Sequence, residues 1–211
     1  MLVLGDAHAD TPANRRALLA AYGAAEDDVA LQLGDLLCYD LPAPTWFIAG
    51  NNEDFDVIDA LRAGETPPGV ANLHLLASDV VELQGRRFAG LSGNFAPTQF
   101  DKPRSALRGD RRRHFVRADV ERAKALEDVD VLLCHEAPHG LYHYAAYDPG
   151  CTHIDGLIQA LHPELCLVGH HHEHAECRFA GSRVVGLAPT WERWYRLDPD
   201  TLDLESHPTE P

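Results

Sequence analysis

The stretch MLVLGDAHAD, residues 1–10, begins with a short apolar run and turns polar at Asp6. An apolar run of this length that ends at a glycine is typical of a buried strand, and the polar residues after it then lie in a loop. Asp6 and His8 are therefore expected in the loop at the carboxyl end of the first strand. Thr11 and Pro12 follow, and because threonine caps helices and proline favours their first position, we expect a helix to about residue 22.

The same pattern recurs along the chain. Further strands are predicted in DDVALQLGD (27–35), TWFIAGNNED (45–54), VDVLLCHEAPHG (129–140) and, after a helix, THIDGLIQALHPELCLVGH (152–170). Seven side chains of metal-ligand type come at these strand ends: Asp6, His8, Asp35, Asn51, His135, His170 and His172. Each motif alone is typical of a turn or a helix cap. Ligands in open α/β proteins gather outside the carboxyl ends of strands, so we expect the seven to converge.

The remaining segments mix helices with hairpins. Helices are predicted over residues 54–64 and 117–128, hairpins within 73–93 (turn at Gln84-Gly85) and 177–189, and a closing strand at 193–198. Residues 94–117 are rich in Pro, Gly, Asp and Arg and are predicted to be irregular and lid-like. This pattern favours the α/β (α+β) class with layered sheets, in a single domain over residues 1–211.

Composition excludes several classes of function. The longest apolar runs are too short to cross a bilayer, and the N-terminal residues contain no targeting signal. Five cysteines without a C-x-x-C pair indicate reduced thiols in a cytoplasmic protein. The net charge of −15 argues against broad binding to nucleic acid or to anionic membranes. Bound cations can still reverse the sign of one site, so an anionic substrate is not excluded.

Five blocks in order, GDAHAD, LQLGD, AGNNED, LLCHEAPHG and VGHHHEH, resemble the calcineurin-like metallophosphoesterase family. That family's pattern is D-x-H, G-D, G-N-[HD]-[ED], a strand-end histidine and G-H-x-H, and the likeness spans about residues 1–190. CHEAPHG also resembles a loop of the small bacterial and archaeal phosphodiesterase-like members. The resemblance implies a four-layer αββα fold, a β-sandwich flanked by helices.

The resemblance further implies two divalent metal ions, with manganese favoured and iron, zinc or nickel as alternatives. Carried over by motif, one metal is held by Asp6, His8, Asp35 and His172, and the other by Asp35, Asn51, His135 and His170. A metal-bridging hydroxide would attack a phosphodiester or another activated phosphate ester, with Asp35, His135 and Asn52 as the catalytic residues. The implied substrate is a small phosphate-containing anion of nucleotide type. The oligomeric state stays open.

One position departs from the family pattern. Asn52 stands where members commonly carry the histidine that protonates the leaving group. Because general acid catalysis contributes about 10²–10⁴-fold, we expect slow turnover of simple alkyl phosphates and a preference for diesters and good leaving groups. The alternatives are a proton from His74, His139 or His143, or a scaffold protein whose catalysis is lost. A metal-storage role for the histidine cluster would leave the carboxylates unexplained.

Residues near the motifs have competing interpretations. Glu53 and Asp54 are expected to cap the next helix or orient Asn51, whereas His171 and His174 are expected to face solvent or support the ligands. RGDRRRHF (108–115) is a solvated loop or helix start, or a mobile arm that contacts an anionic substrate. The tryptophans of the segment TWERW, Trp191 and Trp194, are expected to close the core rather than stack on a base.

Overall fold

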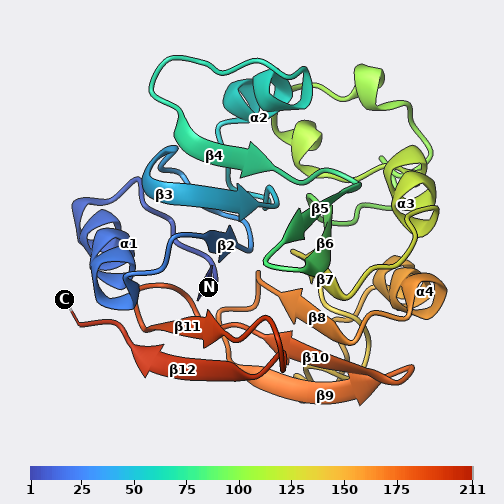
Figure 1. Cartoon of the computed structure of the whole chain (residues 1–211). Coiled ribbons are helices and arrows are strands. Elements are labelled where there is room, and N and C mark those ends of the chain that lie inside the picture. The colour runs from blue at the N-terminus through green and yellow to red at the C-terminus, as the bar shows by residue number, and fades with distance from the viewer. Residues whose placement is uncertain (211) are drawn as a thin grey trace.

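The computed structural model describes residues 1–210, which form two six-stranded sheets and four α-helices (Figure 1). The first sheet has the order β12-β11-β1-β2-β3-β4 and the second the order β5-β6-β7-β8-β10-β9. The strands are β1 (Leu2–Leu4), β2 (Ala30–Gln32), β3 (Asp40–Phe47), β4 (Ala71–Leu75), β5 (Asp79–Leu83), β6 (Arg86–Leu91), β7 (Val131–Cys134), β8 (Leu165–Val168), β9 (Ala175–Phe179), β10 (Ser182–Gly186), β11 (Arg193–Leu197) and β12 (Leu204–Pro208). The helices are α1 (Pro12–Ala25), α2 (Phe55–Arg62), α3 (Arg117–Lys124) and α4 (Thr152–Leu161), with two 3₁₀ turns, η1 (Arg104–Ala106) and η2 (Gly109–Arg113).

Three apolar clusters define the layers. One lies between the two sheets and contains Val3, Leu31 and Leu133. A second lies between the first sheet and helices α1 and α2, and a third packs α3 and α4 on the outer face of the second sheet. Figure 1 shows α1 outside one sheet and α3 and α4 outside the other. The expected four-layer αββα sandwich is confirmed.

Parallel pairing places the carboxyl ends of neighbouring strands at the same edge of each sheet. β1, β2 and β3 are parallel neighbours, as are β7 and β8 in the other sheet. Backbone bonds also join the two sheets at this end, from Gly93 N to the carbonyl of Ala49 at 2.6 Å. The loops that leave these five strands therefore meet at one edge of the sandwich, which is the general place for a ligand site.

Two helix caps set the loops beside this edge. The Thr11 hydroxyl accepts a bond from Asn14 N at 3.2 Å, with Pro12 at the first position of α1, as the sequence predicts. The Asp54 carboxylate accepts from Asp56 N at 3.0 Å and starts α2 immediately after the GNN turn. Helix α1 runs to Ala25, three residues beyond its expected end.

Two elements differ from the sequence prediction. β3 begins at Asp40, earlier than expected, because a register shift between Asp40 and Thr45 accommodates two prolines that lack the backbone donor. The sequence does not predict β12, since its side chains are mostly polar and it pairs only with β11 at the sheet edge.

The segment 94–117 is more ordered than expected. It contains η1 and η2 and a bridge between Asn94 and His114. Arg112 donates to Asp56 at 2.7 Å and to Asp59 at 2.9 Å, and Phe115 is fully buried. Through Arg112, the 108–115 stretch is joined to α2.

Candidate metal centre

The candidate ligands converge from both sheets. Asp6 follows β1, Asp35 follows β2, and His135 follows β7 in the other sheet, yet all three are buried with ligand atoms within 4.8 Å of one another. A second group with the same spacing joins Asp6 to His8 and His172. Asp6 belongs to both groups, so the two form one continuous cluster.

The group of Asp6, His8 and His172 holds two imidazoles against carboxylates. His172 Nε2 lies 2.9 Å from Asp6 Oδ2 and 3.3 Å from His8 Nε2. His8 Nε2 in turn lies 3.5 Å from Asp35 Oδ2. Three nitrogen and oxygen donors at this spacing leave room for one cation between them.

In the group of Asp6, Asp35 and His135, the imidazole of His135 has a fixed tautomer. His135 Nδ1 lies 2.8 Å from the carbonyl oxygen of Leu33, which can only accept, so Nδ1 carries a proton. The opposite atom, Nε2, faces Asn51 Oδ1 at 3.0 Å and Asp35 Oδ1 at 3.6 Å. A neutral ring would point its lone pair at two acceptors, and only a proton or a metal ion stabilises that arrangement. The donor set therefore fits a divalent cation.

Asp35 reaches both groups. Its Oδ2 faces His8 and its Oδ1 faces His135. Asn52 fixes the carboxylate from the other side, because its backbone N donates to Oδ1 and its Nδ2 donates to Oδ2, both at 2.7 Å. These two bonds fix the carboxylate with one oxygen toward His8 and the other toward His135.

His170 is positioned differently from the other histidines. Its backbone N donates to Asp6 Oδ1 at 2.9 Å, and its ring centroid lies 4.9 Å from that of His135. Burial, together with the charge of His135, lowers the pKa of His170 to about 4 and keeps the ring neutral. The structure thus places His172 with Asp6 and His8, and His170 beside His135.

The acid–base balance of the cluster favours a cation. Burial by itself raises the pKa of Asp6, but His135 and bonds from His172 and His170 N more than offset it, and the net pKa is lowered. Burial likewise opposes charge on His135, yet Asp6 and Asp35 raise its pKa overall. A hydrogen bond to Asp6 raises the pKa of His172. The two imidazoles hold protons because the Asp6 and Asp35 carboxylates lie beside them, and metal ions would compete for the same positions.

The backbone is strained at the ligands. Four candidates have left-handed φ angles: His8 at 43°, Asp35 at 54°, His170 at 73° and His172 at 54°. Such a conformation costs roughly 1–3 kcal/mol in a residue other than glycine and persists only when its surroundings enforce it. Glycine provides the space, because a Cβ at Gly50 would collide with Asp35 Oδ1.

Glu53 supports the centre in a way that the sequence pattern only partly indicated. Its buried carboxylate accepts bonds from Leu36 N (3.2 Å), Gly50 N (3.2 Å) and the Tyr39 hydroxyl (2.7 Å). It therefore ties the loop after β2 to the loop after β3, and burial raises its pKa to about 7. Asp54, not Glu53, caps α2.

The prediction that Trp191 closes the core is wrong. Only Trp194 is buried in the core, whereas Trp191 is half-buried beside the ligands. Its ring centroid lies 5.2 Å from that of His172 and 5.8 Å from that of His8. Thr190 anchors this position, since its backbone N donates to the Asp6 carbonyl at 2.8 Å. An aromatic wall therefore borders the centre.

The three alternative proton donors have partners elsewhere. His74 stacks on Trp46, His139 Nδ1 lies 2.6 Å from Asp155, and His143 lies 3.9 Å from Asp148. None of these contacts involves a candidate ligand.

The two other histidines of the VGHHHEH stretch, His171 and His174, also have partners. His171 lies 3.2 Å from the Tyr144 hydroxyl and packs on Tyr142, and His174 lies 3.2 Å from the Tyr195 hydroxyl. The tyrosine contacts match their expected supporting position.

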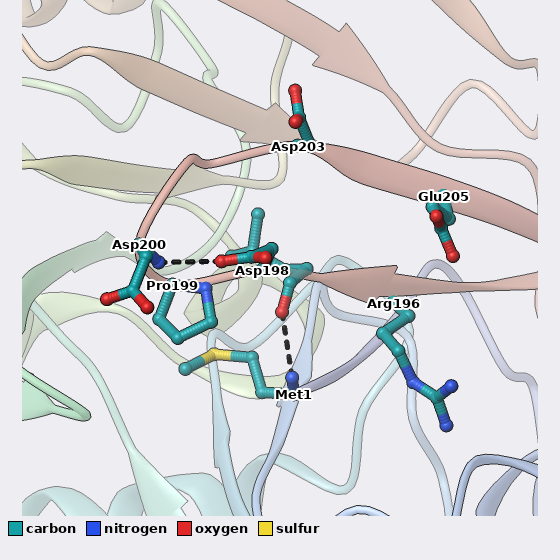
Figure 2. Close-up of a pocket in the computed structure, with 8 residues that line it drawn as sticks. Met1, Arg196, Asp198, Pro199, Asp200, Asp203 and Glu205 are labelled. Carbon is teal, nitrogen blue, oxygen red and sulfur yellow. Dashed lines mark hydrogen bonds between the residues drawn. The ribbon is translucent and has the colours of Figure 1, made fainter.

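A separate pocket of about 420 Å³ lies at the amino end of β1 (Figure 2). The Met1 ammonium donates to the Leu197 carbonyl at 2.8 Å there, and several acidic residues surround it. No candidate ligand lines this pocket, and Asp6 lies past the opposite, carboxyl end of β1. Within residues 1–210, no helix has both the length and the apolar character needed to cross a membrane.

Comparison with known proteins supports the same fold. A crystal structure with 14% sequence identity aligns over 99% of this chain and 98% of its own, with a TM-score of 0.74. The Thermus thermophilus protein TT1561 aligns over 99% of this chain and 98% of its own, with 19% identity and a TM-score of 0.71. GAP50, the anchor in the inner membrane complex of Plasmodium, aligns over 99% of this chain and 77% of its own, with 9% identity and a TM-score of 0.51. At these identities the likeness concerns the fold alone.

Sequence comparison identifies relatives as well. An uncharacterized protein of Haemophilus influenzae is 30% identical over 152 residues, which span 61% of this chain and 62% of that relative's length. The sequence profile of the calcineurin-like phosphoesterases matches residues 1–174, which include every candidate ligand. The chain therefore belongs to the calcineurin-like phosphoesterase family.

Proposed function

We propose that this protein is a dinuclear metal-dependent phosphoesterase, formed by one domain over residues 1–211, that hydrolyses a phosphodiester or another activated phosphate ester. The observation that carries this proposal is the position of Asp35, whose two oxygens face His8 and His135. Family membership implies a phosphoester hydrolase that uses divalent metal ions. One ion would be held by Asp6, His8, Asp35 and His172, and the other by Asp35, Asn51, His135 and His170.

The donor set suits manganese, iron, zinc or nickel, because it combines carboxylate, imidazole and amide oxygen without thiolate. When bound, such ions supply Lewis-acid stabilisation of phosphoryl oxygens and lower the pKa of water. The residues around the ligands contribute by orienting the ligand side chains. Leu33 fixes the tautomer of His135, and Asn52 fixes the carboxylate of Asp35. Only Asp6 and Asp35 bring formal negative charge, so two divalent ions would leave the site cationic and attractive to phosphate.

Three observations support a small anion of nucleotide type with a good leaving group. Asn52 has no titrating proton to deliver, which favours diesters and activated esters. Trp191 presents a ring beside His8 and His172 on which a base can stack. The net charge of −15 disfavours long nucleic acid. All five cysteines are free, which supports a reducing, cytoplasmic location.

The direct test is Mn²⁺-dependent hydrolysis of bis-p-nitrophenyl phosphate. We expect activity in the purified protein and losses of at least about 10²-fold in the Asp35→Asn and His135→Ala variants. Asp110→Asn, which removes an exposed carboxylate that within residues 1–210 pairs only with Arg113, is the matched control and should retain full rate. Folded Asp35→Asn and His135→Ala proteins with full activity would contradict the site.

A non-catalytic scaffold is the second candidate, and Asn52 is the observation that favours it. GAP50 is named as an anchor in a membrane complex, so the fold is compatible with such a role. The complete set of seven ligand-type residues argues for catalysis. Metal binding without hydrolysis of any activated phosphate ester would favour the scaffold.

A further inference from the structure

A second charged pocket lies between the end of α2, the connection from β4 to β5, and α3. Its volume is about 470 Å³, and its charged lining comprises Arg62, Arg104, Arg122, Asp79 and Asp119. No residue of the metal centre lines it. Helix α2 has eight residues and is about 12 Å long, so its length separates Arg62 from the GNN turn at its other end.

Arg62 is the unusual member of this group. Within residues 1–210 its guanidinium has no ion pair or hydrogen bond, and its Nε is buried without a partner. Burial, together with the neighbouring charges of Arg104 and Arg122, lowers the pKa of Arg62 to about 10. A partly desolvated cation without a bonded partner is unfavourable. Asp119 and Asp59 are near enough to oppose the fall in the pKa of Arg62, but neither contacts its guanidinium.

The carboxylates nearby are already paired. Asp119 accepts two bonds from Arg104 and a third from Val116 N at 2.9 Å. Asp59, on the same helix as Arg62, accepts from Arg112 at 2.9 Å. Asp79, at the start of β5, is exposed. The negative groups within reach of Arg62 are therefore engaged or solvated.

Arg122 is oriented into the same region. Its Nε donates to the Ser78 carbonyl at 3.3 Å, and a terminal nitrogen donates to the Ala77 carbonyl. Both acceptors are neutral, so the charge of Arg122 is not balanced. Three guanidiniums and two carboxylates, of which Asp119 is paired and Asp79 is exposed, leave the pocket with an excess of positive charge in a chain of net charge −15.

We propose that this pocket is a second anion site, which binds a phosphate group through Arg62 and Arg122. Guanidinium groups that approach from separate chain segments match a tetrahedral oxyanion, which offers acceptors in several directions, better than a planar carboxylate. The site is independent of the metal centre. It needs neither a metal ion nor the proposed hydrolysis.

The test is equilibrium dialysis with radiolabelled inorganic phosphate. Metal-free wild-type protein and the Asp35→Asn variant should both bind phosphate, because the pocket does not use the metal centre. Arg62→Gln and Arg122→Gln should each raise the Kd about tenfold or more, since each removes a charged hydrogen-bond donor. Arg111→Gln is the matched control, because Arg111 is an exposed arginine of η2 that does not line the pocket, and its Kd should not change.

The bound phosphate group could be free inorganic phosphate or part of a phosphate ester, and competition with glycerol 2-phosphate distinguishes the two. Displacement of the radiolabelled phosphate shows that the site admits an esterified phosphate. No displacement shows that the site is specific for free phosphate. An unchanged Kd in both Arg62→Gln and Arg122→Gln, or the loss of all phosphate binding in Asp35→Asn, would overturn the proposal. Should a variant fail to fold, the anomalous signal of tungstate in crystals of the wild-type protein decides. A peak between Arg62 and Arg122 supports the site, and its absence at saturating tungstate overturns it.

Discussion

Asn52 donates two hydrogen bonds to one carboxylate: its backbone N and its side-chain Nδ2 each lie 2.7 Å from an oxygen of Asp35. The residue that replaces the family's common histidine therefore positions a ligand. It is not free to deliver a proton. This relationship links the one departure in the sequence motif to the geometry of the proposed metal centre.

The Asn52→Ala variant should consequently lose metal affinity and not proton transfer. Removal of one bond to a charged group costs about 1.5–3 kcal/mol, so we expect Mn²⁺ to bind at least about tenfold more weakly. At saturating Mn²⁺, the dependence of rate on leaving-group pKa across a series of substituted phenyl phosphodiesters should match that of the wild type. A loss of rate that grows with leaving-group pKa would instead assign Asn52 to stabilisation of the leaving group by a hydrogen bond.

Glu53 should act on the metal through the two loops it joins. Glu53→Gln keeps the shape but weakens bonds from Leu36 N and Gly50 N, and we expect metal affinity to fall about 10–100-fold. Tyr39→Phe removes one donor and should have a smaller effect. Titration with Mn²⁺, followed by isothermal calorimetry, measures both. Tyr147→Phe, at an exposed tyrosine, is the control, and equal affinities in all four proteins would show that the network does not position the ligands.

Trp191 should contribute to substrate affinity through stacking. Stacking of a base on an aromatic ring is worth about 1–3 kcal/mol, so Trp191→Ala should raise the inhibition constant of a nucleoside monophosphate about 5–100-fold. Trp191→Phe should restore most of the affinity. The inhibition constant of inorganic phosphate, which has no base, should stay the same. Equal weakening of both inhibitors in Trp191→Ala would indicate disturbance of His8 and His172 instead.

The ion pair of Asp119 with Arg104 should give the fold a measurable pH dependence. Burial alone would raise the pKa of Asp119, but Arg104 more than offsets it and holds the pKa below its ordinary value. A carboxyl whose folded-state pKa is lowered stabilises the fold above its unfolded pKa and loses that contribution as the pH falls through the folded value. Asp119→Asn should therefore cost about 1–3 kcal/mol at neutral pH and much less in strong acid, measured by urea unfolding. The same loss under both conditions would contradict the assignment, and Asp110→Asn should change little in either.

The strand ends and their ligand-type residues could be predicted because short apolar runs and glycine-bounded turns are local signals. β12 could not, since an edge strand with polar side chains has no buried face to impose alternation. The early start of β3 could not be predicted either, because Pro42 and Pro44 ordinarily argue against a strand.

The sequence pattern could not predict which side chains from distant segments lie in contact. Trp191 approaches His8 only because Thr190 is bonded to the backbone of Asp6 and Gly5. Arg62 and Arg122 are 60 positions apart in the sequence. They share a pocket because α2 packs on β4 and Arg122 of α3 reaches the connection from β4 to β5. Local sequence motifs indicate which functional side chains a chain contains, and the fold determines which residues surround each of them.

The measurement that tests the central claim most directly is anomalous diffraction from crystals grown with Mn²⁺. We predict two manganese peaks, one among Asp6, His8 and His172 and one among Asn51, His135 and His170, with Asp35 contacting both. Asp35→Asn crystals should lose at least one peak. A single peak, or two peaks that Asp35 does not touch, would contradict the dinuclear centre.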